Sequence, residues 1–122
     1  MLIAARRDPH LGPVVVVGAG GTETEVLRDI RMECAPVTAH TATAMLEGLR
    51  MAPLLRGWRG RAPVDIPALA DAVVAVSGLI AARADIAEIE LNPVRATATG
   101  AVAVDALVIT QCSPHDSEGT QR

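Results

Sequence analysis

Lysine is missing from this 122-residue sequence, in which all eleven basic residues are arginine. Its absence excludes Schiff-base chemistry, a lysine general base and the lysine of a P-loop. Phenylalanine and tyrosine are missing too, and Trp58 is the one aromatic residue. With no aromatic platform for stacked bases and a net charge of −3, the chain is expected to bind no nucleic acid.

Cysteine is also scarce. Cys34 and Cys112 are too few for a zinc cluster and have no CxxC spacing. We expect two reduced thiols, one buried and one exposed in the tail, in preference to a disulfide between them. The sequence has no apolar run of about 18 residues and no N-terminal signal pattern, which predicts a cytoplasmic protein without a membrane segment.

Apolar residues, by contrast, make up half of the chain, and the mean hydropathy is positive. Such a composition favours a folded chain over a disordered one. We expect one domain over residues 1–110. The polar segment 111–122 has nothing to bury and is predicted to be a disordered tail.

Apolar runs bounded by glycine and proline predict five strands, at residues 2–5, 14–17, 30–35, 86–91 and 101–109. Helical spacing of apolar residues predicts helices near 38–50 and 65–84, with Thr38 and Asp65 as their N-caps. The segment 51–64 is rich in glycine and proline and is expected to be a loop. The predicted fold is an α/β sandwich, with a mostly antiparallel sheet and both helices packed on one face.

The strand at 86–91 carries the strongest signal for chemistry. Its apolar residues occupy the odd positions and should be buried under the 65–84 helix. The polar residues Glu88, Glu90 and Asn92 fall on the opposite face. Two carboxylates and an amide in one row point either to solvent or toward a cation.

Asp105 is the one charged residue in the otherwise apolar strand 101–109. A buried, ionised aspartate is costly unless it is paired or bound to a metal. If a hairpin turns near Thr97, Asp105 lies opposite Glu90 to Asn92, within cross-strand reach. A few oxygen ligands on neighbouring strands suit Mg²⁺, which keeps its other positions for water and phosphate. The alternative is a solvated strand face in which Asp105 pairs with a nearby arginine.

Two weaker features have the chemistry to bind phosphate. Gly20 and Gly21 follow a strand and can leave backbone amides free to bind an anion. A tight turn needs the same residues, however, and the sequence is neither GxGxxG nor Walker A. Arg56 and Arg59 can hold a phosphate or a phosphorylated loop bidentately, or they are simply solvated. Trp58 between these arginines is expected to anchor their loop against the core.

Four segments of the chain occur in a familiar order: RRDPHLGPVVVVGAGGTETEVLRD, LLRGWRGRAP, EIELNPV and AVAVDA. Together they resemble the C-terminal half of the ATP-grasp domain of NDP-forming acyl-CoA synthetases. That family includes ADP-forming acetate–CoA ligase, and its ATP-grasp domain is related to the succinyl-CoA synthetase β subunit. The resemblance covers about residues 2–109, nearly all of the ordered chain.

The resemblance implies the C-terminal lobe of an ATP-grasp fold that binds Mg²⁺ and ATP or ADP. In ATP-grasp enzymes a Glu-x-Asn element on a late strand supplies Mg²⁺ ligands, and it matches Glu90 and Asn92. In the succinyl-CoA synthetase branch the metal pair is this asparagine and an aspartate on the next strand, which match Asn92 and Asp105. The implied reaction makes acyl-CoA from acid, CoA and ATP through acyl-phosphate and phosphohistidine intermediates.

Other parts of the family's enzymes have no match in this sequence. These are the N-terminal ATP-grasp lobe with its lysine, the CoA-binding and ligase domains, and the phosphate-carrying histidine, a role that His10, His40 and His115 do not take. We expect a piece that is inactive alone, whether a truncated gene product, a separate subunit or an excised part, and whose partners are those missing regions. The alternative is a non-catalytic regulatory or assembly domain, as in ATP-grasp regions fused to protein acetyltransferases.

Overall fold

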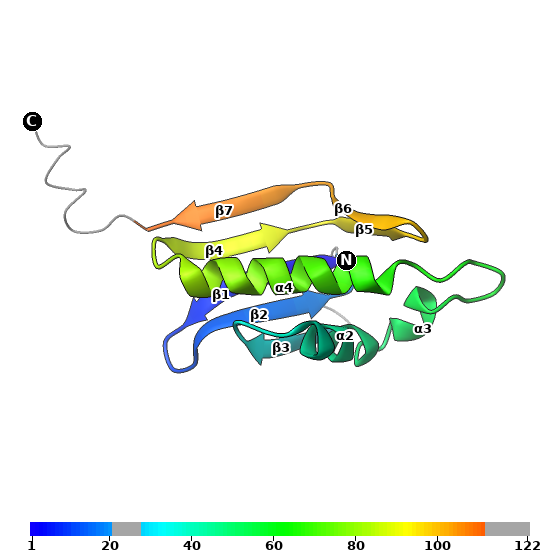
Figure 1. The fold of residues 1–122 in the computed structure, drawn as a ribbon, viewed down its shortest axis with the longest axis horizontal. Helices are drawn as coiled ribbons and strands as arrows, with labels where there is room; N and C mark the ends of the chain where they lie inside the picture. Colours follow the sequence, from blue (N-terminus) through cyan, green and yellow to red (C-terminus); the bar gives the residue numbers. More distant parts are fainter. Residues whose placement is uncertain (21–27, 112–122) are drawn as a thin grey trace, which may run out of the picture.

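The computed structural model describes residues 1–20 and 28–111. The elements in chain order (Figure 1) are β1 (Leu2–Asp8), β2 (Gly12–Gly18), β3 (Ile30–Cys34), α2 (Ala39–Glu47), α3 (Ala52–Leu55), α4 (Ile66–Ala82), β4 (Ile86–Leu91), β5 (Val94–Thr97), β6 (Gly100–Ala103) and β7 (Ala106–Thr110). Gly21 and residues 112–122 of the predicted 111–122 tail lie outside the described residues. Gln111, the first residue of that predicted tail, is ordered, since its backbone N–H donates to the carbonyl of Asp85 at 2.8 Å. None of the described helices is long and apolar enough to cross a membrane.

Five strands form one sheet in the order β3-β2-β1-β4-β7, and every neighbouring pair is antiparallel. The remaining two strands, β5 and β6, form a separate antiparallel hairpin. The predicted antiparallel sheet is therefore confirmed. In the chain, β4 follows β3 and the helices. In the sheet it pairs with β1, the first strand, and not with β3.

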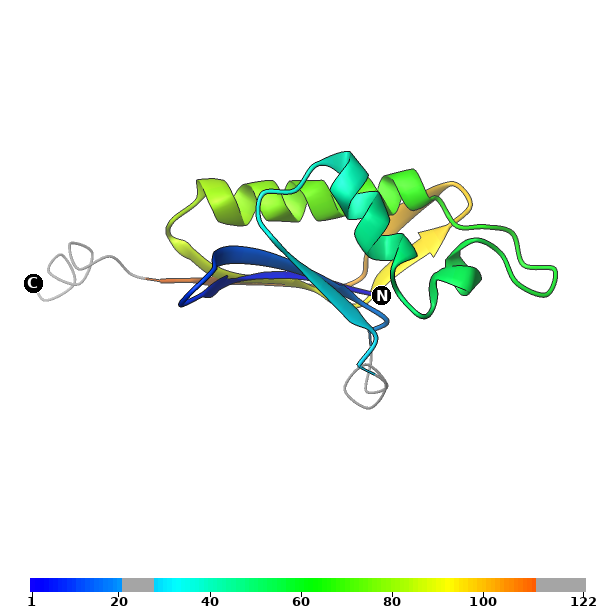
Figure 2. The same ribbon diagram turned by 90° about the horizontal axis from the view of Figure 1, so that it is seen from below.

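The helices α2 and α4 lie on the same face of the large sheet, as predicted (Figure 2). Alternate residues of the strands point toward these helices, because side chains of a strand alternate between its two faces. Burying an aliphatic side chain contributes about 1.5–3 kcal/mol, so this layer supplies most of the stability. The least exposed large residues of the core are Ile3, Val15, Val17, Leu46, Leu69, Val73 and Ile80.

Both predicted N-caps are confirmed. The Thr38 side chain accepts the backbone N–H of Thr41 at 3.2 Å, and the Asp65 side chain accepts that of Ala68 at 3.0 Å. Each cap satisfies one of the backbone donors that have no partner within the helix. The α2 helix is shorter than predicted, since it ends at Glu47, with Gly48 as its C-cap.

The predicted loop at 51–64 contains the short helix α3, and its anchor is not Trp58. The Trp58 side chain is 51% exposed, so the prediction that it anchors the loop in the core is wrong. The aliphatic residues of α3, Ala52 and Leu55, are buried instead. An indole ring is bulky and demands a deep pocket, whereas one turn of helix places two small apolar groups on the core at once.

The single strand predicted at 101–109 is wrong. The segment forms β6 and β7, which belong to different sheets and are separated by Val104 and Asp105. The predicted turn near Thr97 is present, but it closes the β5–β6 hairpin, where Thr97 faces Gly100. Pro93 lies two residues after the end of β4, and because proline donates no backbone hydrogen bond, the ladder of the large sheet stops there.

A register shift between Ile86 and Glu88 alters which residues of β4 are buried. Ile86 and Ile89 lie in the core, whereas Ala87 and Leu91 are half-buried. Of the odd positions only Ile89 is fully buried, so the expected burial of all of them is wrong at both ends of the strand. A bulge adds one residue to one strand of a pair, and it brings two residues that are three apart to the same face.

All five residues of β3 are exposed, although the pattern predicted a half-buried strand. The strand lies at one edge of the sheet, so one side of its backbone has no neighbouring strand in the described structure. Cys34 is a free, exposed thiol, which corrects the expectation that it is buried. Alternation of residue types fixes the two faces of a strand, but it does not reveal whether the strand is central or at an edge.

Candidate metal centre

The end of β4 and the start of β7 bring the predicted metal ligands together. The backbone N–H of Asn92 donates to the carbonyl oxygen of Asp105 at 3.1 Å. Leu91 then pairs with Ala106, so the register continues from this bond into the β4–β7 ladder. The prediction that Asp105 lies opposite Asn92 is confirmed.

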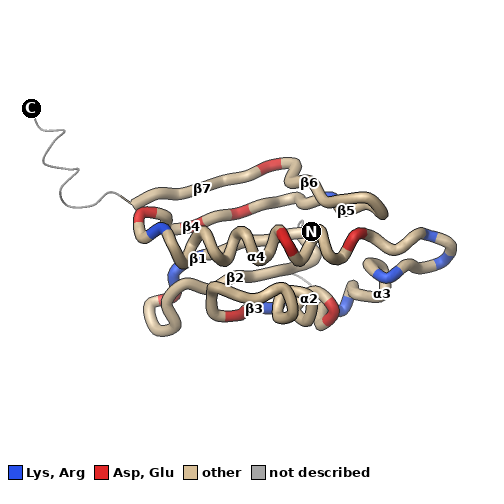
Figure 3. The backbone as a smooth tube through the Cα atoms, in the orientation of Figure 1, with Lys and Arg blue, Asp and Glu red and all other residues tan. Residues whose placement is uncertain are grey.

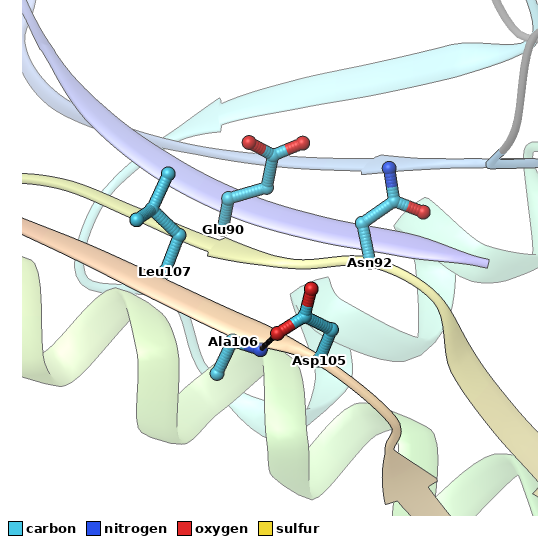
Figure 4. Close-up of a pocket in the computed structure, with 5 residues that line it drawn as sticks. All are labelled: Glu90, Asn92, Asp105, Ala106 and Leu107. Carbon is cyan, nitrogen blue, oxygen red and sulfur yellow. Dashed lines mark hydrogen bonds between the residues drawn. The ribbon is translucent and has the colours of Figure 1, made fainter.

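The side chains of Glu90 and Asn92 extend from the same side of β4, and Asp105 reaches toward them from the neighbouring segment (Figure 4). With Ala106 and Leu107 they line an open hollow of about 170 Å³. The hollow is on the sheet face away from the helices, because Ile89, on the other face of β4, is part of the core.

Small and buried neighbours support this arrangement. Ala4 of β1 pairs with Glu90, so no bulky side chain of β1 stands beside this carboxylate. Ile86 and Ile89 fix β4 to the helices on its other face. The Asn92–Pro93 peptide bond is cis, and Val94 beyond it donates its N–H to the carbonyl of Met1 at 2.7 Å. The segment that carries Glu90 and Asn92 is thus fixed before them by the core and after them by the hydrogen bond to Met1.

Asp105 is exposed, which differs from the burial expected of it. Its Oδ1 accepts the backbone N–H of Ala106 at 2.9 Å. In the described parts of the chain the one ion pair joins Arg83 and Asp85, at 2.8 Å, so Asp105 has no arginine partner there. The alternative in which Asp105 forms an ion pair with arginine does not hold among these residues.

The donor set fits Mg²⁺ in its chemistry. Glu90 and Asp105 offer carboxylate oxygens and Asn92 an amide oxygen, and Mg²⁺ prefers such hard oxygen ligands. Among residues 1–20 and 28–111, no protein group hydrogen-bonds to the side chain of Glu90 or Asn92. No three His, Cys, Asp or Glu residues in these segments are clustered closely enough to hold a metal by themselves. A cation here would therefore need Asn92 and oxygen atoms from water or phosphate to complete its shell.

Of the weaker phosphate candidates, Gly20, Arg56 and Arg59 do not line this hollow, and Gly21 lies outside the described residues. Gly20 has a φ of +82°, and a Cβ there would lie 3.0 Å from the backbone carbon of Met1, so the turn itself requires glycine. Arg56 and Arg59 are exposed, and the Arg59 guanidinium lies 5.9 Å from the centre of the Trp58 ring. Basic positions gather in the loop between α3 and α4, while acidic positions lie on β4 and next to β7 (Figure 3).

The two histidines in the described part of the chain do not assemble into a site. His10 is exposed in the turn between β1 and β2, His40 is exposed in the first turn of α2, and His115 lies outside the described residues. Beside His10, the Asp8 side chain accepts the N–H groups of His10 and Leu11 at 2.8 and 2.9 Å. The hydrogen bonds from Leu11 and then His10 hold the pKa of Asp8 below its usual value.

Sequence reasoning missed Asp29, which is 3% exposed. Its carboxylate accepts the backbone N–H groups of Arg50 at 2.6 Å and Met51 at 3.0 Å. Its own carbonyl accepts the N–H of Ala19 at 3.2 Å, next to Gly20. Asp29 thus ties the end of β2 to the turn between α2 and α3. Its partners are 21 and 22 residues away along the chain, and no local motif announces them.

Relatives of this chain are ADP-forming acetate–CoA ligases. A model of the ATP-grasp domain family matches residues 1–110. The chain is 40% identical over 109 residues to subunit β of acetate–CoA ligase (ADP-forming) I from Pyrococcus furiosus, covering 89% of this chain and 47% of that subunit. It is 37% identical over 105 residues to acetate–CoA ligase (ADP-forming) I from Archaeoglobus fulgidus, covering 86% of this chain and 15% of that protein. The chain therefore spans about half, or less, of the relatives that it matches.

Solved structures agree with these relatives. Dinucleotide-forming acetyl-coenzyme A synthetase 1 of Ca. Korarchaeum cryptofilum, in complex with coenzyme A and Mg-AMPPCP, matches with a TM-score of 0.87 and 38% identity. The match covers 90% of this chain and 52% of that chain. Sequence, fold and segment order agree, and the chain belongs to the ATP-grasp domain of the ADP-forming acetate–CoA ligase family.

Proposed function

We propose that this chain is the part of an NDP-forming acyl-CoA synthetase that binds Mg²⁺ and the phosphates of ATP or ADP. The complete enzyme would make acyl-CoA from acid, CoA and ATP through acyl-phosphate and phosphohistidine intermediates. The observation that carries the proposal is the pairing of Asn92 with Asp105, which brings both side chains and Glu90 to one open hollow. The relative from Ca. Korarchaeum cryptofilum, solved with Mg-AMPPCP and coenzyme A, supports it.

In this proposal the three side chains hold and orient the metal–phosphate group. Glu90 and Asp105 provide negative charge, while the Asn92 amide oxygen adds a ligand without adding charge. When bound, Mg²⁺ neutralises charge on the phosphate oxygens during phosphoryl transfer. The bond from Ala106 to Oδ1 of Asp105 fixes the direction of that carboxylate before any ligand arrives.

The chain alone is not expected to make acyl-CoA. The family's N-terminal lobe supplies a lysine and the adenine-binding strands, and this sequence contains no lysine. We propose that this lobe and the CoA-binding and ligase domains are its partners, on the same chain or on another. Half of a nucleotide site buries less of its ligand than a closed cleft, so the affinity for ATP should be weak.

The test is titration of the 122-residue chain with Mn²⁺ and ADP, monitored by paramagnetic broadening of its amide NMR signals. We expect the signals around Asn92 and Asp105 to broaden first. Asn92→Ala and Asp105→Asn should abolish this selective broadening. The control is Glu88→Gln, which removes a carboxylate of the same strand that does not line the hollow.

If both variants fold and broaden as the parent does, the metal assignment is wrong. A second measurement separates the catalytic from the non-catalytic form of the proposal. Addition of the missing lobe and ligase domains should restore ADP release that depends on acid and CoA. Metal binding without any such activity would favour the regulatory domain.

A further inference from the structure

Among residues 1–20 and 28–111, no strand pairs with the outer edge of β3. Ala35 donates its N–H to Pro13 at 2.9 Å, and Ala19 donates to Asp29 at 3.2 Å, at the two ends of the β2–β3 ladder. In an antiparallel pair, residues alternate between bonding to the partner strand and pointing their backbone groups away from it. Odd-numbered residues of β3 therefore bond to β2. The N–H and C=O groups of residues 30, 32 and 34 point to the free edge.

The sequence of β3, Ile-Arg-Met-Glu-Cys, is complementary to itself in the antiparallel direction. If a second copy pairs with it about a two-fold axis at Met32, Arg31 lies opposite Glu33 of the second copy, and Glu33 lies opposite its Arg31. Ile30 then faces Cys34, and Met32 faces Met32. Opposite charges directly across a strand pair stabilise it, and apolar pairs do the same.

The side chains of Arg31 and Glu33 are available for these ion pairs between two copies. In the described structure Arg31 and Glu33 form no ion pair with any group of their own chain. The Arg31 Nη1 instead donates to the carbonyl of Ile30 at 3.0 Å, one of the carbonyls that point to the free edge. A hollow of about 340 Å³ between β3 and α2, lined by Arg31, Glu33 and His40 among others, leaves room for the partner's charged side chains.

The apolar side chains of β3 lie on the other face of the sheet. Ile30 is 43% exposed and Met32 44% exposed. Exposed apolar residues on a flat edge strand invite pairing, and proteins that avoid it place proline, a bulge or unmatched charges there. Here the charges are matched, so they select one register rather than prevent pairing.

We propose that β3 is the interface through which two copies of this chain form a symmetric dimer. Antiparallel pairing of the two β3 strands joins the two five-stranded sheets into one continuous sheet. The two-fold axis is perpendicular to this sheet, so the helical layers of both copies lie on the same face. Because β3 and β7 are opposite edges, Asp105 stays away from the interface, and the proposal does not depend on metal binding.

The other edge, β7, is the competing surface. All its residues are exposed and none is charged. A neutral strand gives no cross-strand charge pair to fix one register or one partner. We therefore assign the symmetric dimer to β3, and the test includes β7 explicitly.

The experiment is sedimentation velocity of the 122-residue chain over a series of concentrations. The parent should show a monomer–dimer equilibrium. Arg31→Glu gives two acidic residues on β3 and Glu33→Arg gives two basic ones, so both cross-strand pairs become repulsive in each homodimer. For each variant alone, the dissociation constant of the homodimer should rise roughly tenfold or more. Each should therefore be mostly monomeric at the concentration at which half of the parent is dimeric. An equimolar mixture of the two should form a heterodimer with parent-like stability.

A backbone test complements the charge test. Met32→Pro removes a N–H that points to the free edge and leaves the bonds to β2 intact, so the dimer should be lost while the fold remains. Val108→Pro is the matched variant on β7, since Asn92 bonds to Asp105 and alternation then directs the N–H of Val108 outward. It should leave the dimer unchanged.

Three results would overturn the proposal. The first is a parent chain that stays monomeric at all concentrations. The second is a mixture of the two charge variants that behaves as the sum of its components. The third is a dimer that survives Met32→Pro and is lost in Val108→Pro, which would assign the interface to β7.

Discussion

The Arg7 guanidinium of β1 donates a hydrogen bond to the carbonyl oxygen of Ile80 at 2.8 Å, near the C-terminal end of α4. It also donates to the carbonyls of Arg83 at 2.6 Å and Ile86 at 2.9 Å. One arginine thus joins the first strand, the end of the longest helix and the start of β4. The last carbonyls of a helix have no partner within it, and a cation placed there is favourable.

Arg7→Ala should lower the free energy of unfolding by about 1–3 kcal/mol, because two partly buried carbonyls and an exposed one lose a charged donor. Arg7→Lys should recover only part of this loss, since an ammonium group cannot reach three carbonyls with a planar fork. The control is Arg6→Ala. Arg6 is exposed, and its side chain makes only a long hydrogen bond in the described structure, 3.8 Å to the sulfur of Met32. Its loss should therefore change stability by less than about 0.5 kcal/mol. Urea unfolding of the three variants provides the measurement, and equal losses for Arg6→Ala and Arg7→Ala would contradict the assigned role.

Asp8 should make the stability depend on pH in the acid range. Hydrogen bonds from Leu11 and His10 hold its pKa below the usual value, so the folded state favours the ionised carboxylate. The resulting stabilisation is present above the unfolded pKa, about 4, and is lost as the pH falls through the lower folded pKa. The melting temperature of Asp8→Ala should therefore lie below that of the parent at pH 7, and the gap should narrow in acid. A gap that stays constant down to pH about 2 would show that Asp8 acts through packing alone.

Local patterns predict those parts of the fold whose burial follows from their own sequence. The apolar runs of β1, β2 and β4 and the helical spacing of apolar residues in α2 and α4 mark these segments as core elements. The facing of Asn92 and Asp105 was also predictable, since two strands and a turn between them fix which residues meet. The family resemblance named the same residues independently.

What the sequence does not reveal is the arrangement of elements that are distant along the chain. The pattern of β3 is that of a half-buried strand, but strand order places it at an edge. The burial of Asp29 depends on backbone groups of Arg50 and Met51, which arrive only when the α2–α3 turn packs on the end of β2. The division of 101–109 into two strands depends on the β5–β6 hairpin packing against α4, not on the apolar residues of that segment.

The loop before α4 offers a direct comparison of a buried aliphatic and an exposed aromatic residue. Leu55 is 5% exposed and Trp58 is 51% exposed. Leu55→Ala should lower the free energy of unfolding by about 2–5 kcal/mol, because it leaves a cavity in the core. Trp58→Ala should cost less than about 1 kcal/mol, since half of the residue is exposed and its cation–π contact with Arg59 lies at the surface. Denaturant unfolding compares the two, and a larger loss for Trp58→Ala would restore the anchor role expected from the sequence.

Substitution of Asp105 tests whether its carboxylate is a metal ligand or a part of the fold. The residue is exposed, and its hydrogen bond from Ala106 can be kept by an asparagine oxygen. Asp105→Asn should therefore change the free energy of unfolding by less than about 0.5 kcal/mol, the usual range for a surface substitution. If Asp105 is a metal ligand, the same variant should strongly weaken the effect of Mg²⁺ on phosphoryl transfer once the missing lobe and ligase domains are supplied, because a charged oxygen ligand is lost.

The decisive measurement is the rate against Mg²⁺ concentration for Asp105→Asn, Asn92→Ala and the parent, beside urea unfolding of each. Glu88→Gln serves as the control, since it removes a neighbouring negative charge without touching the hollow. A shift of the Mg²⁺ midpoint in the first two variants, with unfolding unchanged and Glu88→Gln like the parent, is expected of ligands. A loss of stability with an unchanged Mg²⁺ midpoint would instead make Asp105 part of the fold, and the open face of β4 would have no metal to hold.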